Sequence, residues 1–391
     1  MKIMLANFTK MVNDTGGMAK VTVSFANEMV RRGHDVSLVY SDEKSGDFYY
    51  PISDQVKCID LRFQNNKRIK FPLLRKIKRE LYRFIDERKS RTVGIDFGRD
   101  YLSDYCSKVV NMEQPDVIVS FNPGTSALLF CASDKLPPLV TMSHGDPEDY
   151  FKFYPYRSVE AVKKSTINQV LLPSFSEHLK KYAPECRTIV IGNAIPQFEE
   201  KAKLDTIKNQ YKVIFVARLA KSHKRPHLLI NAFALVAEKH PDWILELWGA
   251  KDNKAYYREL ELLVKSKGLS NRVFFKGVTN DVPSKLREAD ILAFPSSWEG
   301  FSLALGDGMS VGLPSIGYKN SPSVNELIVD GVNGILVEDG IEDFGNALNR
   351  LMSDRQLRVK MGQAASQAMK FYAPDNIWNQ WEDLLCKLKK S

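Results

Sequence analysis

The sequence lacks the long apolar runs that cross membranes. No stretch contains about 18 consecutive apolar residues, the length that a bilayer-spanning helix requires. The first residues, MKIMLANF, are too short and too polar a stretch for a secretory signal peptide and predict a first strand instead. We therefore expect a cytoplasmic protein that is neither exported nor embedded in a membrane.

Cysteines are few, and their spacing carries no pairing pattern. The five cysteines are Cys58, Cys106, Cys131, Cys186 and Cys386, and none forms a C-x-x-C pair. This spacing argues against a disulfide framework and against a zinc knuckle, and it is typical of proteins in a reducing compartment.

The length and charge suggest a two-domain protein with one unusual segment. A chain of 391 residues, 44% of them hydrophobic, is long enough for two globular domains. The net charge is +9, and residues Lys67 to Arg91 alone hold eleven lysines and arginines against three acids. The high isoelectric point is therefore mostly a property of this segment.

The basic segment predicts an amphipathic helix after Pro72. Its apolar residues recur at intervals of three and four: Leu73, Leu74, Ile77, Leu81, Phe84 and Ile85. The helix either lies on an anionic membrane surface, inserting Phe71, Leu73 and Leu74, or binds nucleic acid, or packs its apolar stripe on its own domain. No known nucleic-acid-binding module accompanies it, so we expect no nucleic-acid partner.

The stretch ILAFPSSWEGFSLALGDGMSVGLP is the most informative part of the sequence. Residues Ile291 to Phe294 predict a buried parallel strand, which Pro295 ends. A helix is expected from Leu303 onward and is ended by Gly312. A loop between a strand end and a helix start is where open α/β sheets bind ligands.

That loop is suited to an anion such as a diphosphate. The free amides of the first helical turn, from Phe301 through Ser302 and Leu303, can donate to it, and Gly300 allows close approach. Glu299 stands beside this position, and Asp307 follows two helical turns later.

Basic residues follow another predicted strand, which precedes this stretch in the same half of the chain. Residues Val213 to Ala217 predict a strand, Arg218 follows it, and Lys224 and Arg225 precede the next helix. Cations and free amides at one helix start suit a phosphate group. A solvated basic loop is the alternative interpretation.

The N-terminal half begins in a similar way. A strand at Lys2 to Ala6, a loop with Gly16 and Gly17, a helix, and a strand at Asp35 to Tyr40 form the start of a Rossmann-like unit. The glycine spacing is not that of a dinucleotide fingerprint. His144 follows another predicted strand and is expected at the same edge of the sheet.

Together these motifs resemble the retaining family-4 glycosyltransferases of the GT-B fold. The resemblance lies in Glu299 with its Gly-Phe and an acid eight residues later, in Arg218 with Lys224, and in the Gly-Gly loop with its R-G-H-x-V segment. This chain has Asp307 where the family's second acid is usually glutamate. It also has Arg225 where the family's lysine is usually followed by glycine, at a spacing one residue longer.

The resemblance implies a role for each matching residue. Arg218 and Lys224, or Arg225 in its place, would hold the donor diphosphate, Glu299 the donor sugar and Asp307 the ribose. His144 would approach the transferred sugar. The expected substrate-binding residues are Gly16, Gly17, Gly249, Val278, Gly300, Phe301, Ser302, Leu303 and Asp307.

The implied architecture is α/β, with two Rossmann-like domains facing each other across a cleft. We expect an acceptor-binding domain at 1–195, a linker at 196–210, a nucleotide-sugar-binding domain at 211–370, and a C-terminal helix at 371–391 that crosses back onto the first domain.

The implied activity is retaining transfer of a hexose or N-acetylhexosamine from a nucleotide sugar, most simply a UDP-sugar. The acceptor would be a glycan or lipid-linked glycan of surface polysaccharide or glycolipid assembly, reached at the inner face of the cell membrane. No metal or other cofactor is expected, since the chain has no D-x-D sequence. The alternatives are a non-catalytic GT-B subunit that supports a partner enzyme, or another GT-B nucleotide-sugar enzyme such as an epimerase.

Overall fold

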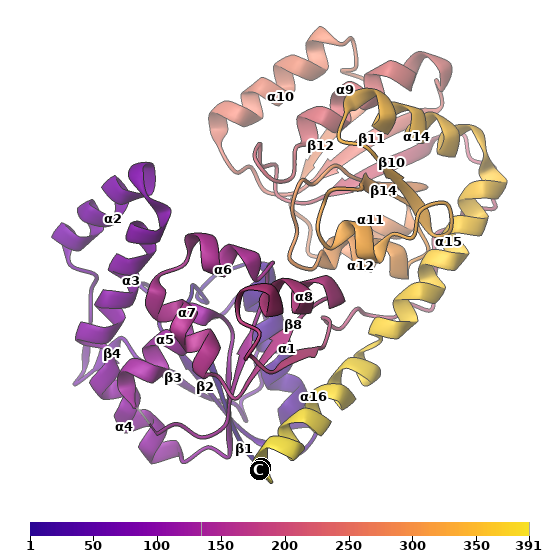
Figure 1. Ribbon diagram of the computed structural model, residues 1–391. Coiled ribbons are helices and arrows are strands. Elements are labelled where there is room, and N and C mark those ends of the chain that lie inside the picture. Colours follow the sequence, from indigo (N-terminus) through magenta and orange to yellow (C-terminus); the bar gives the residue numbers. More distant parts are fainter. Residues whose placement is uncertain (134, 391) are drawn as a thin grey trace. The chain divides into compact units, whose positions relative to one another are not determined.

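The computed structural model describes residues 1–133 and 135–390. The chain divides into two compact units. The first unit comprises Met1–Gly192 and the residues from Trp378 onward, and the second comprises Asn193–Ile377. Each unit is built around its own parallel sheet (Figure 1).

The first unit contains a seven-stranded sheet in the order β3-β2-β1-β6-β7-β8-β9. Its strands are β1 (Lys2–Asn7), β2 (Asp35–Tyr40), β3 (Lys57–Asp60), β6 (Val117–Ser120), β7 (Leu139–Met142), β8 (Ile167–Val170) and β9 (Thr188–Val190). All neighbouring pairs are parallel. The strand order reverses between β1 and β6, which makes the carboxyl ends of these two strands a topological switch point.

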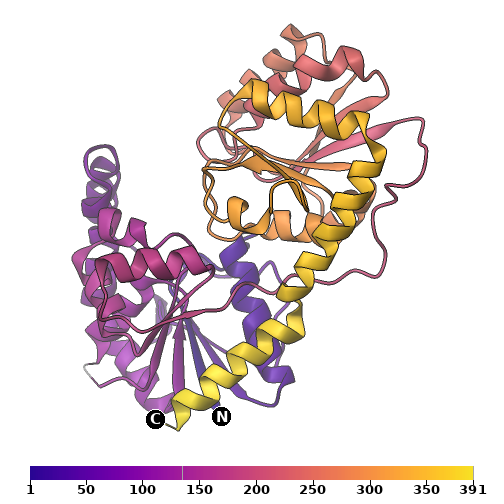
Figure 2. The same cartoon turned by 45° about the vertical axis from the view of Figure 1, so that its right-hand side comes forward.

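Helices cover both faces of this sheet (Figures 1 and 2). The helices of this unit are α1 (Gly17–Arg31), α2 (Leu73–Ile85), α3 (Glu87–Tyr101), α4 (Ser103–Glu113), α5 (Pro123–Ala132), α6 (Glu148–Phe153), α7 (Tyr156–Lys164), α8 (Pro173–Tyr182) and α16 (Pro374–Lys389). Of these, α2 packs on α3 rather than on the sheet. A short hairpin, β4 (Phe63–Gln64) and β5 (Lys67–Arg68), precedes α2. Asn65 and Asn66 close it with positive φ angles, as a tight hairpin turn requires.

Helix α16 packs against α1 through aromatic side chains. Trp378 and Trp381 meet the ring of Phe25 at centroid distances of 5.5 and 4.8 Å. Glu382 adds an ion pair with Arg32 at 2.5 Å, and its other carboxylate oxygen lies 3.3 Å from Nε2 of His34. The buried tryptophans thus join the end of the chain to the first helix of the first unit.

The predicted amphipathic helix forms, but its apolar stripe is not packed on the domain. In α2, Leu74, Leu81 and Phe84 are 82%, 60% and 89% exposed, respectively. The expectation that this stripe simply packs on its own domain is therefore wrong. Helix α2 packs on α3 and projects from the sheet (Figures 1 and 2). Its half-buried residues are Arg75, Arg79, Glu80 and Tyr82, which do not belong to the apolar stripe.

Phe71 does not share the exposure of this stripe. Its ring lies against Phe97 at 4.6 Å, and the Arg79 guanidinium covers it at 4.9 Å. The expected shallow insertion of Phe71 therefore does not fit the structure, whereas Leu73 and Leu74 remain exposed.

The second unit has a six-stranded parallel sheet in the order β12-β11-β10-β13-β14-β15. Its strands are β10 (Tyr211–Val216), β11 (Trp243–Trp248), β12 (Val273–Gly277), β13 (Ile291–Phe294), β14 (Ser315–Tyr318) and β15 (Gly334–Val337). Its helices are α9 (Pro226–Val236), α10 (Lys254–Ser266), α11 (Val282–Arg287), α12 (Leu303–Ser310), α13 (Val324–Leu327), α14 (Ile341–Ser353) and α15 (Arg355–Met369). Short 3₁₀ turns lie at Ala237–Lys239 and Lys370–Tyr372.

In the second unit, α9, α10 and α14 lie over one face of the sheet, and α11, α12 and α15 over the other (Figure 1). The core combines strand residues such as Phe215 and Leu247 with Phe233 of α9 and Phe344 of α14. Among the residues described, no helix combines the length and apolar character needed to span a membrane.

Candidate active site

The candidate site of the second unit lies where parallel strands of its sheet end. Strands β10, β11 and β13 are adjacent, and the loops after them begin at Ala217, Gly249 and Pro295. The loop before α9 is tied to the loop before α12, because the Ser297 amide donates to the His223 carbonyl at 2.9 Å. This contact brings two sequence-distant motifs together.

Glu299 and Lys224 form an ion pair at this junction. The Lys224 ammonium contacts Oε1 of Glu299, and it also lies 5.5 Å from the centre of the Phe294 ring. The two side chains are only 21% and 9% exposed. A carboxylate this deeply buried needs a charged partner, and Lys224 provides it.

Arg225, the other candidate for the diphosphate, is engaged elsewhere. Its Nη1 contacts the Asp339 carboxylate at 2.8 Å, and its Nε donates to the Pro295 carbonyl at 3.1 Å. The guanidinium also lies 4.7 Å from the centre of the Tyr318 ring. These contacts hold the start of α9 to the sheet and leave Lys224 as the cation beside Glu299.

Arg218 stands more open to solvent than this pair. Its side chain is 60% exposed, and Nη1 pairs with Asp252 at 3.0 Å. Exposed ion pairs are weak, so an incoming anion can replace Asp252 at little energetic cost. Asp252 was not singled out in the sequence, because no motif marked it.

The start of α12 supplies backbone donors next to Glu299. Ser302 caps the helix, its Oγ accepting from the Leu305 amide at 3.2 Å. The amides of Leu303 and Ala304, as in any first helical turn, have no acceptor within the helix. The predicted helix from Leu303 is confirmed, and Gly312 follows it with a φ of 89°.

The remaining predicted residues of this helix turn are buried. Asp307 is 7% exposed and Phe301 8% exposed, with the Phe301 ring against Tyr372 at 5.2 Å. Gly300 is also buried. The buried Gly300 and Phe301 anchor the loop between β13 and α12. Glu299 lies in this loop, shortly before the helix begins.

Gly249 lies just after β11, where the backbones of the neighbouring strand ends approach it closely. Its amide donates to the Gly277 carbonyl at 2.7 Å, and a Cβ there would lie 1.9 Å from the Ala217 carbonyl oxygen. Its φ of 149° is also unfavourable for any other residue. Val278, by contrast, is 63% exposed just beyond β12.

The predicted residues of the first unit are His144, Gly16 and Gly17. The His144 ring stacks on Phe121 at 5.9 Å, and its buried Nε2 has no hydrogen-bond partner among the described residues. Burial lowers the pKa of His144 to about 4, so the ring is neutral at pH 7. Gly16 caps α1, and Gly17 is its first residue.

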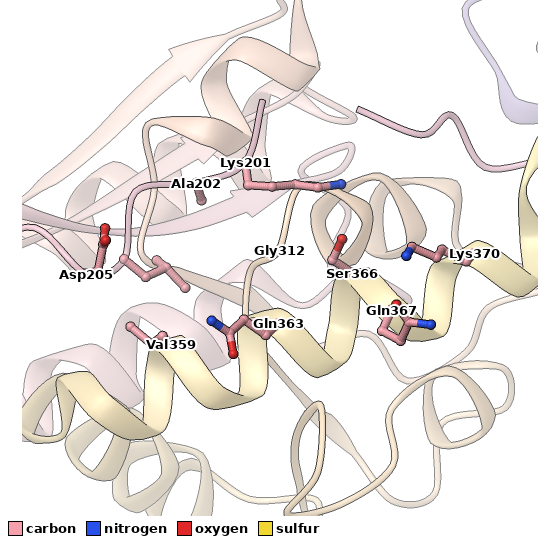
Figure 3. Close-up of a pocket in the computed structure, with 11 residues that line it drawn as sticks. Lys201, Ala202, Asp205, Gly312, Val359, Gln363, Ser366, Gln367 and Lys370 are labelled. Carbon is pink, nitrogen blue, oxygen red and sulfur yellow. The ribbon is translucent and has the colours of Figure 1, made fainter. Parts of the chain in front are cut away.

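Two cavities were not anticipated from the sequence. One, of about 440 Å³ in the second unit, lies between Lys201, the Gly312 turn and α15 (Figure 3). It contains none of the predicted site residues, and its Lys201 ammonium is engaged with the Ser310 carbonyl at 2.8 Å. The other, in the first unit, is described below.

Two protein families match consecutive parts of the chain. The family described as Glycosyltransferase Family 4 matches residues 15–196, and the family described as Glycosyl transferases group 1 matches residues 196–368. The chain belongs to glycosyltransferase family 4. The match boundary at residue 196 lies close to the division between the two units at Gly192 and Asn193.

Similar proteins include glycosyltransferases of two bacteria. The chain is 28% identical over 183 residues to a poly(glycerol-phosphate) alpha-glucosyltransferase of Bacillus subtilis, covering 46% of this chain and 27% of that protein. It is 30% identical over 189 residues to the UDP-Gal:alpha-D-GlcNAc-diphosphoundecaprenol alpha-1,3-galactosyltransferase of Escherichia coli, covering 46% and 44%. The chain thus spans less than half the length of these two relatives.

The fold of this family 4 member matches that of a solved structure at low sequence identity. Alr3699/HepE of Anabaena, in complex with UDP and glucose, superposes with a TM-score of 0.72 at 20% identity, covering 99% of both chains. The expected GT-B fold is thereby confirmed.

Replacing Gly249 by alanine is predicted to destabilise the second unit by about 2–4 kcal/mol, because the new Cβ overlaps the Ala217 carbonyl. Urea unfolding measures this change. Gly268→Ala is the control, since Gly268 also has a positive φ, of 70°, but no atom within 4 Å of a Cβ. It should cost only about 1 kcal/mol. Equal losses of unfolding free energy in the two variants would show that the close approach of Gly249 to the Ala217 carbonyl is not the cause.

Proposed function

We propose that the protein is a retaining glycosyltransferase that moves a hexose or N-acetylhexosamine from a UDP-sugar to a glycan acceptor, without a metal ion. The observation that carries the proposal is the buried Lys224–Glu299 pair at the start of α12, inside the region that matches Glycosyl transferases group 1. The UDP and glucose bound to Alr3699/HepE support a UDP-sugar donor.

In this proposal the donor diphosphate binds at the start of α12. The free amides of Leu303 and Ala304 donate to its oxygens, and the flexible Lys224 ammonium turns from Glu299 toward it. Arg218 exchanges Asp252 for the same diphosphate. These fixed positive groups stabilise the charge that develops as the nucleoside diphosphate leaves.

The reaction then forms one bond and breaks one at the anomeric carbon. The acceptor hydroxyl oxygen attacks the anomeric carbon, the bond from that carbon to the diphosphate oxygen breaks, and the departing diphosphate takes the hydroxyl proton. Attack from the face that the diphosphate leaves retains the anomeric configuration.

Glu299 orients the donor sugar by accepting hydrogen bonds from its hydroxyls.

A donor panel tests the proposed chemistry. UDP-, GDP- and ADP-sugars are incubated with the purified protein and candidate glycan acceptors, with and without EDTA, and nucleoside diphosphate release is measured. We expect EDTA-resistant turnover of a UDP-sugar, a product of retained anomeric configuration, and a loss of about 10²–10³-fold in kcat in Glu299→Gln. Loss with EDTA would refute metal independence, and an inverted product would refute retention.

A matched ion pair provides the control. Glu259 pairs with Lys221 at 2.9 Å on the exposed surface of the same unit, and Glu259→Gln should leave turnover within about twofold. Failure of every nucleotide sugar to bind would overturn the proposed function. Nucleotide-sugar binding without turnover on any acceptor would favour the non-catalytic subunit instead.

We further propose that the first unit acts at the inner face of the cell membrane through α2. Its exposed apolar stripe runs beside Arg75, Lys76 and Lys78, the combination that anionic lipid surfaces attract. The diphosphoundecaprenol in the name of the Escherichia coli relative supports an acceptor held in a membrane.

Co-sedimentation with vesicles containing anionic lipid tests this surface. Leu81→Glu should weaken vesicle binding about tenfold, because an inserted leucine contributes about 1.5–3 kcal/mol. Leu262→Glu is the matched control, since Leu262 is 59% exposed on α10 and Leu81 is 60% exposed. Equal binding of both variants and wild type would refute the membrane role of α2.

A further inference from the structure

The first unit contains a cavity of about 420 Å³ at the carboxyl ends of its strands. Its wall includes Phe8 and Thr9 after β1, Ser41 after β2, and Asn122 after β6. Strands β1 and β6 are the neighbours at which the strand order reverses. Ligands of open parallel sheets bind at such a position.

Three arginines line this cavity, and none of its described lining residues is acidic. Arg62 is 8% exposed and lies 4.8 Å from the centre of the Phe97 ring. Its Nε donates to Ser41 Oγ at 3.1 Å, while Nη1 has no partner among the described residues. Burial lowers the pKa of this guanidinium, an electrostatic cost that a bound anion would offset.

Arg79 and Arg91 reach the cavity from α2 and α3. Arg79 pairs with Glu80 at 3.3 Å and Arg91 with Glu87 at 2.6 Å, each an acid of its own helix. Their guanidinium groups lie over aromatic rings, those of Phe71 at 4.9 Å and Tyr154 at 4.2 Å. The rings hold both cations in place without neutralising them.

The start of α5 adds further donors to the same wall. Asn122 caps this ten-residue helix, its Oδ1 accepting from the Thr125 amide at 2.9 Å. Its Nδ2 is buried and has no partner in the described part of the chain, as is also true of Ser158 Oγ. Both residues line the cavity, so unsatisfied polar groups and a positive helix end converge there.

The rest of the wall is apolar. Its apolar members include Met18, Ile95, Phe97, Leu102 and Leu128. A ligand that fits this lining carries its negative charge next to an apolar portion. Arginine is suited to phosphate because its planar fork donates two hydrogen bonds to neighbouring oxygens.

We propose that this cavity binds the phosphate or diphosphate group of the acceptor, so that the acceptor is a phosphate ester rather than a neutral glycan. This inference rests on the proposed glycosyltransferase function and specifies its second substrate. The apolar wall holds the part of the acceptor that adjoins the phosphate, and the three arginines select against uncharged sugars.

The test uses octyl phosphate and inorganic phosphate as probes of the full-length protein. Binding is measured by titration calorimetry with saturating UDP, which occupies the donor site and removes its diphosphate contacts from the signal. Octyl phosphate should bind under these conditions. Arg79→Gln and Arg91→Gln should each weaken it about tenfold, since a hydrogen bond to a charged group contributes that much.

Arg83→Gln is the matched control. Arg83 also lies on α2 and pairs with the same Glu80, at 2.9 Å, but its side chain is 65% exposed and does not line the cavity. Its variant should bind octyl phosphate as wild type does. Arg79 and Arg91 are partly exposed, so both variants should fold, which UDP binding and circular dichroism verify.

The outcomes separate this inference from the proposed function. If UDP binds but octyl phosphate does not, the cavity does not bind the acceptor phosphate, while the donor site stands. The same conclusion follows if Arg83→Gln weakens octyl phosphate binding as much as Arg79→Gln and Arg91→Gln do. Absence of UDP binding would refute the proposed function, while the phosphate titration still decides whether the cavity binds anions. Tighter binding of octyl phosphate than of inorganic phosphate indicates a lipid-linked acceptor, and equal binding indicates a water-soluble phosphate ester.

Discussion

The buried ion pair between Lys224 and Glu299 is the interaction on which the site of the second unit depends. Removing either partner would leave an uncompensated charge in a nearly dry loop, which is far more costly than losing an exposed pair. The pair therefore fixes the two loops that the Ser297–His223 hydrogen bond also joins. It holds the start of α12, with its free amides, beside the Lys224 side chain.

Around this pair, the other predicted residues divide into those that build the site and those that remain open. Gly249 and Phe301 hold the backbone by close contacts, and Arg225 fastens the start of α9 to Asp339. Arg218, with its exposed partner Asp252, is the cation most accessible from solvent. A rigid frame with one weakly held and one flexible cation is suited to receiving a diphosphate.

The sequence predicted the two parallel-sheet units and the motifs of the second unit well, because their signals are local. The strand at Trp243–Trp248 and the turn into α12 are set by apolar runs, a proline and a glycine. The apolar run Val170 to Leu172 predicts a strand there, whereas β8 lies at Ile167–Val170. Its signal was hidden because Asn168 and Gln169 are buried polar residues whose amides donate to backbone carbonyls.

Some features of the structure depend on contacts between segments far apart in the sequence, and these features could not be predicted from the sequence. Local sequence could not show that Lys224 pairs with Glu299 while the adjacent Arg225 pairs with Asp339. Periodicity identified α2, but it could not say which side the domain covers, and the apolar side is the exposed one. Arg62, Arg79 and Arg91 come from a strand end and two helices, so only the fold brings them into one cavity.

Hydrogen exchange in the presence of UDP tests most directly whether the Lys224–Glu299 junction is the nucleotide-sugar site. Saturating UDP should slow exchange of the amides from Gly300 to Leu305 and of those around Arg218 and Lys224, since both loops would contact the diphosphate. Protection of both segments in wild type, and its reduction in Lys224→Gln, is the predicted result. Binding of UDP that leaves both segments unprotected would show that the nucleotide binds elsewhere and would contradict the site.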